Sequence, residues 1–366
     1  MNEDLRIRKL PPVWFIRSID AVRSALLRIN RRMFPASVVL YERFQSLWLL
    51  PCIKVAAELD IARLLEEKPR SVEELASITR SDSGNLFRLM RALSSQGIFR
   101  QQKDQLYVNT AMSKALIDGN DSLRYMILHH VGEVNWSTLG QLSYSVKTGK
   151  DAFSHIHGQR IYDFLKQDPH ESELFDKSMT NLTELAIEPI LSAYDFSTFK
   201  TITDVGGGEG LLLSGILYKN KKLSGILFDL EEGLRKSPEI LQKYGVSDRV
   251  KTIAGSFFDE NIPTSDAYIL KNIIHNWSET ECITILSNIR KAMTDTGKIL
   301  VVEMIIPEDN RFSYGKLIDI QMMVTMHEGR ERTRKEYDQL FRNSGLVISR
   351  IVPTIAPFSI IEAIKA

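Results

Sequence analysis

The sequence contains only two cysteines among its 366 residues, Cys52 and Cys282. A single, widely separated pair gives neither a disulfide framework nor the spacing of a zinc site, and we interpret both as reduced thiols. The chain also lacks a surplus of charge, because 47 Lys and Arg are balanced by 46 Asp and Glu. Nucleic-acid binding usually needs a basic surplus on one face, so this balance argues against it.

Long hydrophobic runs are absent as well. No stretch reaches the ~18 consecutive apolar residues that a membrane span needs. The nearest candidate, residues 47–57, contains Pro51 and Lys54. Residues 1–35 are basic, but the apolar core at 14–16 is too short for a signal peptide. We therefore expect a cytoplasmic protein without a membrane span.

The basic N-terminal segment has a regular pattern of its own. Apolar residues recur three or four positions apart, at Ile16, Ile19, Val22, Leu26 and Ile29. This spacing predicts an amphipathic helix. Such a helix fits a membrane surface, or a partner-binding or dimer-forming arm, and we favour the arm.

The first half of the sequence is helical and contains one compact pattern. Ser71 and Glu74 form a capping box at the start of a short helix, and a second helix follows the turn at 81–84. Gly97 ends the second helix, and short strands on either side of residues 101–105 predict a hairpin. This winged-helix pattern either binds DNA through its second helix or serves as a packing and dimerisation scaffold. The near-neutral charge favours the scaffold.

Residues 111–195 are also predicted to be helical and are richer in aromatic residues and histidines. His155 and His157 resemble a metal-binding pair, but positions i and i+2 of a helix point to different sides. No carboxylate or cysteine cluster completes a site around them, so we expect no metal. We interpret this segment as a pocket wall or as ordinary core.

The last segment, residues 196–366, alternates short apolar strands with helices. Five stretches are predicted as strands: 201–205, 224–230, 250–253, 267–270 and 299–305. This alternation predicts a parallel sheet with helices on both faces, the doubly wound α/β class. The chain then divides into a basic arm (1–35), a winged-helix region (36–110), a helical segment (111–195) and an α/β domain (196–366).

A glycine-rich turn follows the first predicted strand, in Asp204-Val-Gly-Gly-Gly-Glu-Gly210. Gly206, Gly208 and Gly210 let a ligand approach the backbone at the start of the next helix. The turn lacks the last glycine of the dinucleotide fingerprint and the Gly-Lys-Ser/Thr of a Walker loop. Asp229 ends the second strand, where a doubly wound fold places an acid that binds a ribose diol. Together these features predict an adenosyl ligand, with S-adenosylmethionine ahead of a dinucleotide.

A second group of polar residues follows the fourth strand, in Leu270-Lys-Asn-Ile-Ile-His-Asn-Trp-Ser278. Ligands of open parallel sheets bind beyond the carboxyl ends of the strands, so Lys271 and His275 lie on the functional edge. Glu303 ends the fifth strand, and Glu331 follows within Glu-Gly-Arg-Glu-Arg-Thr. A carboxylate that accepts the Nδ1 proton of the histidine would leave Nε2 to take a proton from a substrate.

These motifs, in this order, resemble those of the S-adenosylmethionine-dependent small-molecule O-methyltransferases. That family includes plant caffeic acid, animal hydroxyindole and bacterial polyketide-tailoring enzymes. The resemblance runs from about residue 36 to the end, and it includes Phe-Asp-Leu, Gly-Ser-Phe-Phe and Gly-Arg-Glu-Arg-Thr. It implies a Rossmann-like class I methyltransferase domain and a homodimer formed by the N-terminal winged-helix half. It also implies metal-independent methyl transfer to a hydroxyl, phenolic in our expectation, of a small aromatic or polyketide-like acceptor, with S-adenosylhomocysteine as product.

The resemblance further implies roles for individual residues. The cofactor would be bound by Gly206, Gly208, Gly210, Asp229, Ser256, Phe257 and Lys271. Within that group, Asp229 would hold the ribose and Lys271 would approach the carboxylate of the cofactor. His275 would be the general base, supported by Glu303 and Glu331. The acceptor pocket would be lined by Met179, Asn276, Met322 and Met326.

Two positions depart from the family pattern. Asn276 stands where many members have Asp after the histidine, so a contact with the acceptor there loses its charge. Ser256 stands where many relatives have an Asp beside the adenine. Residues 1–35 lie outside the pattern, and we interpret them as an arm that wraps a dimer.

Two other functions stay open. A protein with this fold can bind the cofactor and carry out C-methylation, hydroxylation or cyclisation instead, because a fold does not fix its chemistry. A cofactor-sensing DNA-binding protein would use the winged helix. The histidine with its two acids favours O-methylation over the first alternative, and the near-zero net charge counts against the second.

Overall fold

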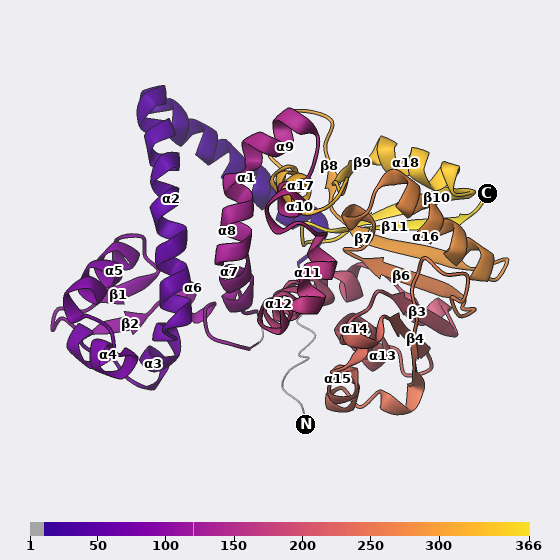
Figure 1. Cartoon of the computed structure of the whole chain (residues 1–366), viewed down its shortest axis with the longest axis horizontal. Helices are drawn as coiled ribbons and strands as arrows, with labels where there is room; N and C mark the ends of the chain where they lie inside the picture. Colours follow the sequence, from indigo (N-terminus) through magenta and orange to yellow (C-terminus); the bar gives the residue numbers. More distant parts are fainter. Residues whose placement is uncertain (1–10, 120) are drawn as a thin grey trace. The chain divides into compact units, whose positions relative to one another are not determined.

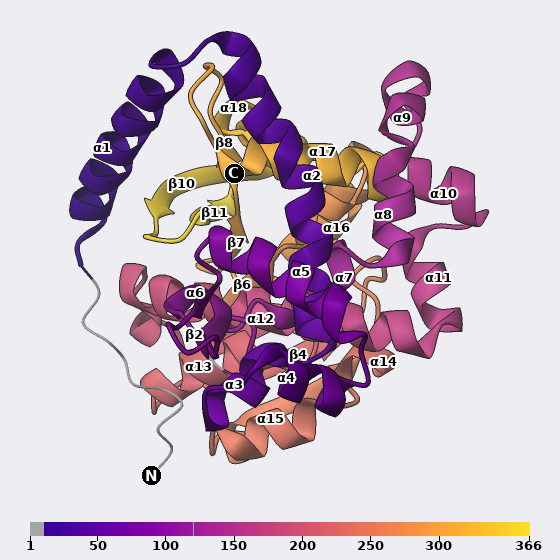
Figure 2. The same ribbon diagram turned by 90° about the vertical axis from the view of Figure 1, so that its left-hand side faces the viewer.

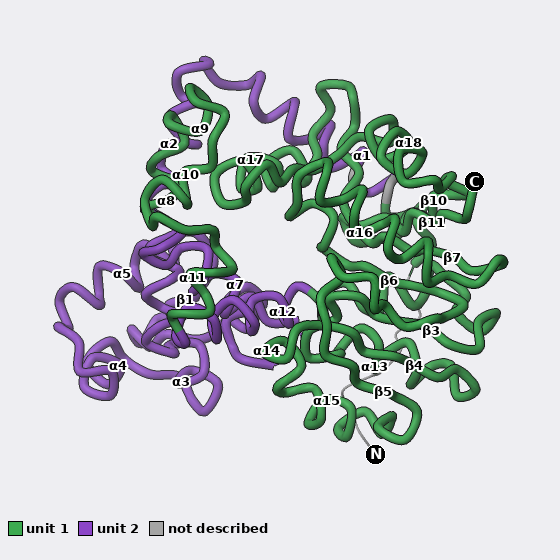
Figure 3. The backbone as a smooth tube through the Cα atoms, turned by 45° about the vertical axis from the view of Figure 1, so that its right-hand side comes forward, with its two compact units in different colours: residues 1–16, 137–168, 183–366 green, residues 17–136, 169–182 purple. Residues whose placement is uncertain are grey.

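The chain folds into two compact units, which a computed structural model describes for residues 11–119 and 121–366 (Figure 3). We call residues 17–136 and 169–182 the helical unit. Residues 11–16, 137–168 and 183–366 form the sheet unit. The predicted segment 111–195 therefore contributes to both units.

The helical unit contains α2 (Ala36–Glu58) and all but the first four residues of a second long helix, α1 (Val13–Arg32). Helix α1 confirms the amphipathic helix predicted between Ile16 and Ile29. Pro35 is the N-cap of α2, and the two helices diverge from the short turn at residues 33–35 (Figures 1 and 2).

The winged-helix pattern is present in the same unit. Its elements, with their flanking helices, are α3 (Ile61–Glu67), α4 (Val72–Thr79), α5 (Ser83–Ser95), β1 (Phe99–Gln101), β2 (Tyr107–Asn109), α6 (Ala111–Lys114) and α7 (Arg124–His130). The Ser71 hydroxyl accepts the Glu74 N–H at 3.3 Å and the Glu74 carboxylate accepts the Ser71 N–H at 3.0 Å, which confirms the capping box. Leu75, Met90 and Tyr107 are fully buried in the core between these elements.

Five helices follow: α8 (Glu133–Gly140), α9 (Leu142–Thr148), α10 (Ala152–His157), α11 (Ile161–Gln167) and α12 (Pro169–Ala193). Of these, α8 and α12 each belong partly to both units. Gly149 and Gly158 end α9 and α10 with φ of +70° and +71°, a left-handed conformation that glycine adopts without steric cost.

One seven-stranded mixed sheet forms the centre of the sheet unit, in the order β10-β11-β7-β6-β3-β4-β5 (Figure 1). Its strands are β3 (Thr201–Val205), β4 (Ser224–Asp229), β5 (Val250–Ala254), β6 (Ala267–Lys271), β7 (Lys298–Glu303), β10 (Leu346–Pro353) and β11 (Ser359–Lys365). The first five run parallel, whereas β11 is antiparallel to both β7 and β10. The strand order reverses between β3 and β6, and ligands of doubly wound sheets bind at such a switch point.

Helices cover both faces of this sheet. They are α13 (Leu211–Lys219), α14 (Glu231–Leu234), α15 (Ser237–Lys243), α16 (Glu279–Ala292) and α18 (Arg334–Asn343), whereas α17 (Tyr314–Thr325) packs against α9 and α10. Short 3-10 helices are η2 (Phe196–Thr198), η3 (Ser247–Arg249) and η4 (Ile274–Asn276), and β8 (Ile305–Ile306) pairs with β9 (Arg332–Thr333). On one face, the buried residues of α16 and α18 form a single hydrophobic core with the strand residues Val205, Leu270 and Val301. On the other face, Leu213 and Leu217 of α13 lie 2.9 Å from where a Cβ on Gly225 would be.

This arrangement confirms the doubly wound α/β class, with an antiparallel hairpin added at one edge. Among residues 11–119 and 121–366, no helix combines the length and the apolar character that a membrane crossing requires.

Near that edge, a buried carboxylate joins the hairpin to the rest of the sheet unit. Glu362 is 3% exposed, and four side chains donate hydrogen bonds to it: Tyr194, Lys298, Ser349 and Arg350. Burial alone would raise the pKa of Glu362, but these donors lower it to about 2. The folded state therefore favours the ionised carboxylate.

We expect Glu362→Gln to lower the free energy of unfolding at pH 7 on the order of 2–3 kcal/mol. Because folding depresses this pKa, the contribution is complete above the ordinary value of 4.5 and is lost as the pH falls toward about 2. Urea denaturation should show a smaller difference between wild type and variant at pH 3 than at pH 7. The exposed Glu308→Gln change serves as control, and an equal Glu362→Gln effect at both pH values would contradict this assignment.

Candidate active site

The glycine turn joins β3 to α13 with three glycines in the left-handed region. Gly206, Gly208 and Gly210 have φ of +69°, +56° and +82°. A Cβ on Gly206 would lie 2.5 Å from Ile273, and one on Gly210 would lie 2.9 Å from Leu227. A Cβ on Gly208 would have no atom within 4 Å. Two of these glycines therefore allow tight packing, while Gly208 leaves the backbone accessible to a ligand.

Asp229, at the end of β4, is tied directly to this turn. Its Oδ2 accepts the Gly208 N–H at 2.7 Å, and its Oδ1 accepts the Leu230 N–H at 2.6 Å. Burial raises the pKa of Asp229, and the two backbone donors partly offset that rise. A carboxylate can accept about four hydrogen bonds, so this fixed group can still accept two more from a ligand.

A buried acid that sequence analysis did not assign to the site, Asp204, is the next-to-last residue of the neighbouring strand β3. Oδ2 of Asp204 is buried without a hydrogen-bond partner among the described residues, as is Oδ1 of Asn272. Burial raises the pKa of Asp204 to about 7 although the charge of Lys271 opposes the rise. Burial likewise lowers the pKa of Lys271 to about 8, against the charges of Asp204 and Glu303. An acid at the last buried positions of β3 was the available signal in the sequence.

The predicted base lies on η4, just beyond the end of β6. Nδ1 of His275 is 2.7 Å from Oε1 of Glu331, and these residues are only 9% and 3% exposed. Burial alone would lower the pKa of His275, but the hydrogen bond and charge of Glu331 raise it above the ordinary value. The backbone of Glu331 is fixed in turn by its N–H bond to Asp319 at 2.8 Å. Nε2 has no hydrogen-bond partner within the described parts of the chain.

Glu303 contacts the backbone of His275 and not its ring. Its Oε1 accepts the His275 N–H at 3.1 Å, and its Oε2 accepts the hydroxyl of Tyr337. Burial raises the pKa of Tyr337 well above its ordinary value, with a further rise from the charge of Glu303. The phenol therefore stays protonated as a donor. Sequence analysis missed Tyr337, which lies in the middle of an amphipathic helix with no motif around it.

The Gly-Arg-Glu-Arg-Thr segment also donates hydrogen bonds to the backbone carbonyls at the turn of η4. Arg332 is fully buried and donates to the carbonyls of Ile274 at 3.1 Å and Trp277 at 3.5 Å. The N–H of Arg330 donates to the His275 carbonyl at 2.8 Å. These bonds fix the main chain on both sides of the histidine. Sequence analysis used only the glutamate of this segment.

An aromatic pair extends the site toward α11. The ring of Tyr162 stacks on Trp277 at a centroid distance of 5.6 Å and an interplanar angle of 18°. Burial raises the pKa of Tyr162, with a smaller rise from Asp229 and an opposing hydrogen bond with Asn276. The Asn276 amide also donates to the Asn272 carbonyl at 3.0 Å. The neutral amide at position 276 is therefore engaged by two neighbours.

The predicted acceptor-pocket methionines divide between the two units. Met322 and Met326 are buried on α17 and at its C-cap. A Cβ on Gly329 would lie 2.5 Å from Cβ of Met326 and 2.8 Å from the His275 carbonyl, so this methionine lies beside the turn of the base. Met179 belongs to the part of α12 in the helical unit, and its place in the pocket stays a prediction.

The two residues expected beside the adenine also lie near the glycine turn. A Cβ on Gly206 would be 3.6 Å from the ring of Phe257, which packs edge-on to Trp277 at 5.7 Å. The Ser256 hydroxyl accepts the Phe258 N–H at 3.2 Å. Both side chains are thus fixed near the carboxyl edge of the sheet.

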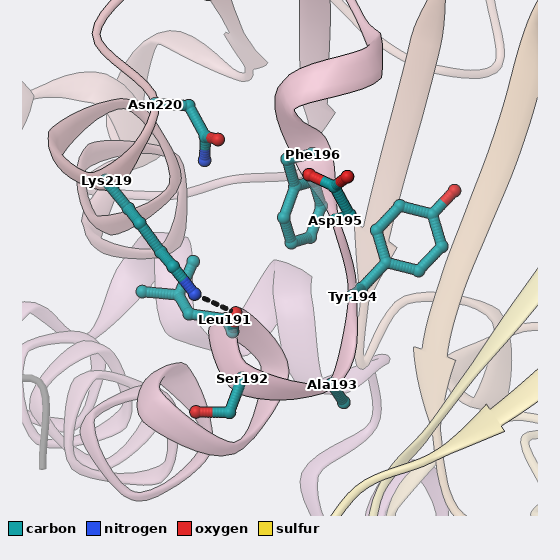
Figure 4. A pocket seen from close by; sticks show the side chains of 8 residues that line it. All are labelled: Leu191, Ser192, Ala193, Tyr194, Asp195, Phe196, Lys219 and Asn220. Carbon is teal, nitrogen blue, oxygen red and sulfur yellow. Dashed lines mark hydrogen bonds between the residues drawn. The ribbon is translucent and has the colours of Figure 1, made fainter. Parts of the chain in front are cut away.

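A surface hollow lies near the amino ends of the strands, at the opposite end of the sheet from the candidate site (Figure 4). It is lined by Leu191, Ser192, Ala193, Tyr194, Asp195, Phe196, Lys219 and Asn220. Most of these residues precede β3, and Lys219 and Asn220 end α13, which places the hollow near the amino ends of the strands. The Lys219 ammonium donates to the Leu191 carbonyl within it. The hollow is separate from the site formed by the strand ends.

The two histidines of α10 have different neighbours, as their i and i+2 spacing predicts. His155 stacks on Tyr144 at 3.9 Å, whereas His157 packs against Phe153 at 4.4 Å. In the described ranges, no group of three or more His, Cys, Asp or Glu side chains could hold a metal ion.

Two protein-family matches cover most of the chain. Residues 136–347 match the O-methyltransferase domain, and residues 41–119 match the O-methyltransferase dimerisation domain. The chain belongs to the O-methyltransferase family.

Individual relatives agree with this assignment. A phenazine O-methyltransferase of Lysobacter antibioticus is 34% identical over 90% of this chain and 96% of the relative. An 8-amino-8-demethylriboflavin N,N-dimethyltransferase of Streptomyces davaonensis is 30% identical over 88% of this chain and 94% of its own. Members of the family thus include an enzyme that methylates an amine.

Solved structures of family members share the whole fold. The crystal structure of LaPhzM is 34% identical with a TM-score of 0.86, and 91% of this chain covers 100% of it. The neocarzinostatin O-methyltransferase NcsB1, solved with S-adenosylmethionine and a naphthoic acid, is 28% identical with a TM-score of 0.74 over 87% of this chain and 96% of its own. This O-methyltransferase is therefore an enzyme with the fold that binds S-adenosylmethionine.

Substitutions of Arg330 and Arg332 in this chain measure how much the buried guanidinium stabilises the turn of η4. We expect Arg332→Met to lower the free energy of unfolding by about 2–4 kcal/mol, because it leaves buried carbonyls without donors. Arg330→Met removes a partly exposed ion pair with Glu279 at 2.9 Å and should cost less than about 1 kcal/mol. Urea denaturation of both variants measures the difference. Equal losses would show that the buried guanidinium does not hold the turn.

Proposed function

We propose that this enzyme transfers a methyl group from S-adenosylmethionine to a phenolic hydroxyl of a small aromatic or polyketide-like molecule, with His275 as general base. The contact between Nδ1 of His275 and Glu331, at 2.7 Å, carries the proposal. It orients the imidazole and leaves Nε2 for the acceptor, at the sheet edge where ligands bind.

The residues at this edge fit the cofactor. Gly208 has open space where a side chain would be, and Asp229 offers a fixed carboxylate for the two ribose hydroxyls. Asp204 and Asn272 each have a buried oxygen without a partner among the described residues, and such atoms need a donor from ligand or water. When bound, S-adenosylmethionine supplies an electrophilic methyl group on a positively charged sulfur. Ser256, Phe257 and Lys271 complete the proposed binding set, with Gly206 and Gly210 shaping the turn.

The base has to remove a proton that a phenol holds strongly. A phenol has a pKa near 10 and an ordinary histidine near 6.5, so full transfer in advance is uphill by roughly 5 kcal/mol. Glu331 raises the pKa of His275 and narrows this gap. We infer that Nε2 takes the proton as the acceptor oxygen becomes bonded to carbon. Help of this kind typically accelerates a reaction by ~10²–10⁴-fold, and positioning supplies much of the rest.

Glu303 has a different proposed role from that of Glu331. It accepts the backbone N–H of His275 and the hydroxyl of Tyr337, and it does not contact the ring. We therefore assign it to positioning the histidine, while Glu331 sets the tautomer and stabilises the imidazolium.

The acceptor is proposed to lie against Met322 and Met326, with Asn276 and the Tyr162 hydroxyl as polar contacts. Apolar side chains with a few polar groups suit a planar aromatic molecule. The phenazine and naphthoic acid named for two family members support this class. Met179 is included as a proposed lining residue from its match to the family pattern.

An amine is the second candidate acceptor, because a relative 30% identical to this chain is an N,N-dimethyltransferase. The remaining alternatives are C-methylation, hydroxylation and cyclisation on the same fold. Mass spectrometry of the products from a panel of phenols, anilines and carbon acids separates these outcomes by the atom that carries the new methyl group.

The match to the dimerisation domain supports a homodimer built from the N-terminal half. We propose that the winged helix serves this role and that neither nucleic acid nor a metal takes part. We also propose that the four segments at 1–35, 36–110, 111–195 and 196–366 are the functional divisions of the chain.

Replacing His275 by Gln is expected to lower kcat on a phenolic acceptor by ~10²-fold or more. The affinity for S-adenosylmethionine should stay within about threefold, because Nε2 faces the acceptor. Part of the loss should return at alkaline pH, where the phenol ionises unaided. Calorimetry and a pH–rate profile measure these effects, and a folded variant with wild-type turnover at neutral pH would exclude base catalysis by this residue.

Glu331→Gln provides the matched variant for this test. It should reduce kcat less than His275→Gln, since it leaves the proposed base in place and removes only the main group that raises its pKa. Its acid limb in kcat/KM should move to lower pH, because the base is then protonated less readily. An acid limb that stays in place would show that Glu331 does not set the pKa of the histidine.

Asp229→Asn should weaken binding of S-adenosylmethionine by about 2–3 kcal/mol, or roughly 30–150-fold, if the carboxylate accepts both ribose hydroxyls. Glu232→Gln, an exposed acid on α14, removes a nearby charge without touching that acceptor and should change affinity less than about threefold. Isothermal calorimetry measures both dissociation constants. An unchanged affinity in the Asp229 variant would contradict the ribose assignment.

A further inference from the structure

The exposed hydrophobic side chains of the described residues are concentrated on two helices. More than half of the large ones lie between Trp14 and Leu50. Monomeric proteins rarely expose contiguous apolar surface of this extent, and such patches mark interaction sites. The two helices concerned are α1 and α2, both at the start of the chain.

Of the seven large hydrophobic residues exposed on α1, five form a narrow seam, and the other two, Trp14 and Leu27, lie outside it. The seam consists of Phe15, Ile19, Val22, Leu26 and Ile29, each between 45% and 62% exposed. Their spacing alternates four and three residues, which averages 3.5 and is typical of a helix that packs along another helix. Arg23 and Asn30, directly after two of these residues, bound the seam closely on one side. A helix that lies on a membrane has a broader apolar face than this.

On α2 the exposed residues form a second stripe. It consists of Leu40, Tyr41, Phe44, Leu47 and Trp48, each between 45% and 69% exposed. This stripe falls at the beginning of the family's dimerisation domain, which starts at residue 41. Because α1 and α2 diverge from their turn, the chain's own α1 does not cover it (Figures 1 and 2).

The seam on α1 is continuous in sequence with the family interface but lies before it. About a tenth of this chain has no counterpart in LaPhzM, although that structure is matched over its whole length. The dimerisation match begins after the last residue of α1, at Arg32. The arm therefore lies outside the part of this chain that matches the dimerisation domain.

The seam and the stripe together amount to about half of a standard interface. The seam spans residues 15–29 and the stripe spans residues 40–48, which corresponds to roughly 36 Å of helix at 1.5 Å per residue. A contact strip roughly 10–12 Å wide along them would bury about 400 Å² per copy, against the ~800 Å² per partner of standard complexes. The arm therefore enlarges a dimer interface and does not form one by itself.

We propose that α1 is a dimerisation arm whose seam packs on the α2 stripe of a second copy of this chain, and reciprocally. The inference rests on the proposed homodimer and adds to it a segment outside the part of this chain that matches the dimerisation domain. The arginines off the seam, Arg28, Arg31 and Arg32, then face solvent on the outside of the dimer.

The test compares two full-length double variants with the same change in charge. Val22→Glu with Leu26→Glu places charges in the seam, whereas Arg28→Gln with Arg31→Gln changes only the opposite face. Sedimentation velocity over a concentration series should show a dimer dissociation constant raised at least ~100-fold in the seam variant. The arginine variant should stay within about threefold of wild type. Circular dichroism and S-adenosylmethionine binding check that both variants fold.

Hydrogen exchange on the wild type gives a second measurement that needs no variant. Amides of residues 13–32 and 40–48 should be protected at concentrations above the dissociation constant and lose protection together on dilution. A seam variant that dimerises like wild type, or protection of 40–48 alone, would overturn the arm while leaving the homodimer intact.

Two further results would overturn the proposal in other ways. A wild type that is monomeric at micromolar concentration would reject the homodimer itself, while methyl transfer by the same sample would leave the enzymatic proposal standing. Binding to vesicles of phosphatidylcholine with phosphatidylserine tests whether a membrane surface, and not a second copy, covers the seam. Binding of wild type that both double variants lose, with dimerisation unchanged in the seam variant, would assign α1 to a membrane surface.

Discussion

The buried contact between His275 and Glu331 constrains the architecture of the whole sheet unit. The two residues lie 56 positions apart and must meet in a region with little access to water. A buried pair of ionisable groups is stable only when the surrounding backbone fixes both partners. Glu303 holds the N–H of the histidine, Arg330 holds its carbonyl, and Asp319 holds the N–H of the glutamate. These bonds fix the main chain of both residues, and within the described residues they leave Nε2 of His275 available for a ligand.

The same sheet edge concentrates negative charge at the switch point of the strand order. Asp229 and Glu303 are the last residues of β4 and β7, Asp204 is the next-to-last residue of β3, and Lys271 is the last residue of β6. Burial raises the pKa of Asp204 to about 7 and lowers that of Lys271 to about 8, so neither charge is favourable there without a partner. A ligand with a sulfonium and an ammonium group brings positive charge to this edge. The negative charge at this edge and the open backbone at Gly208 are two independent features, and both favour S-adenosylmethionine as the ligand.

Much of this arrangement could be predicted from the sequence, because it depends on local rules. The capping box at Ser71, the position of Asp229 at the end of its strand and the place of His275 just beyond another strand follow from short patterns, and the structure has them where expected. Arg332 and Tyr337 could not be found in this way. Arginine is seldom fully buried, and only the fold brings its guanidinium under the turn of η4. The antiparallel β10–β11 hairpin and the contact of Glu303 with backbone also depend on tertiary pairing, which no local spacing encodes.

The lack of charge at Asn276 matters for the pKa of the neighbouring His275. A general base works best when its pKa lies near the operating pH, and Glu331 already raises the pKa of the neighbouring histidine. An aspartate at position 276 would add a further carboxylate beside that turn and raise the pKa again, so that more of the base would be protonated at rest. The amide keeps a hydrogen-bonding group for Tyr162 and for an acceptor without that charge. With His275 as the proposed base, Glu331 is then the main group that raises its pKa, and we propose that the polar contacts at 276 recognise the acceptor.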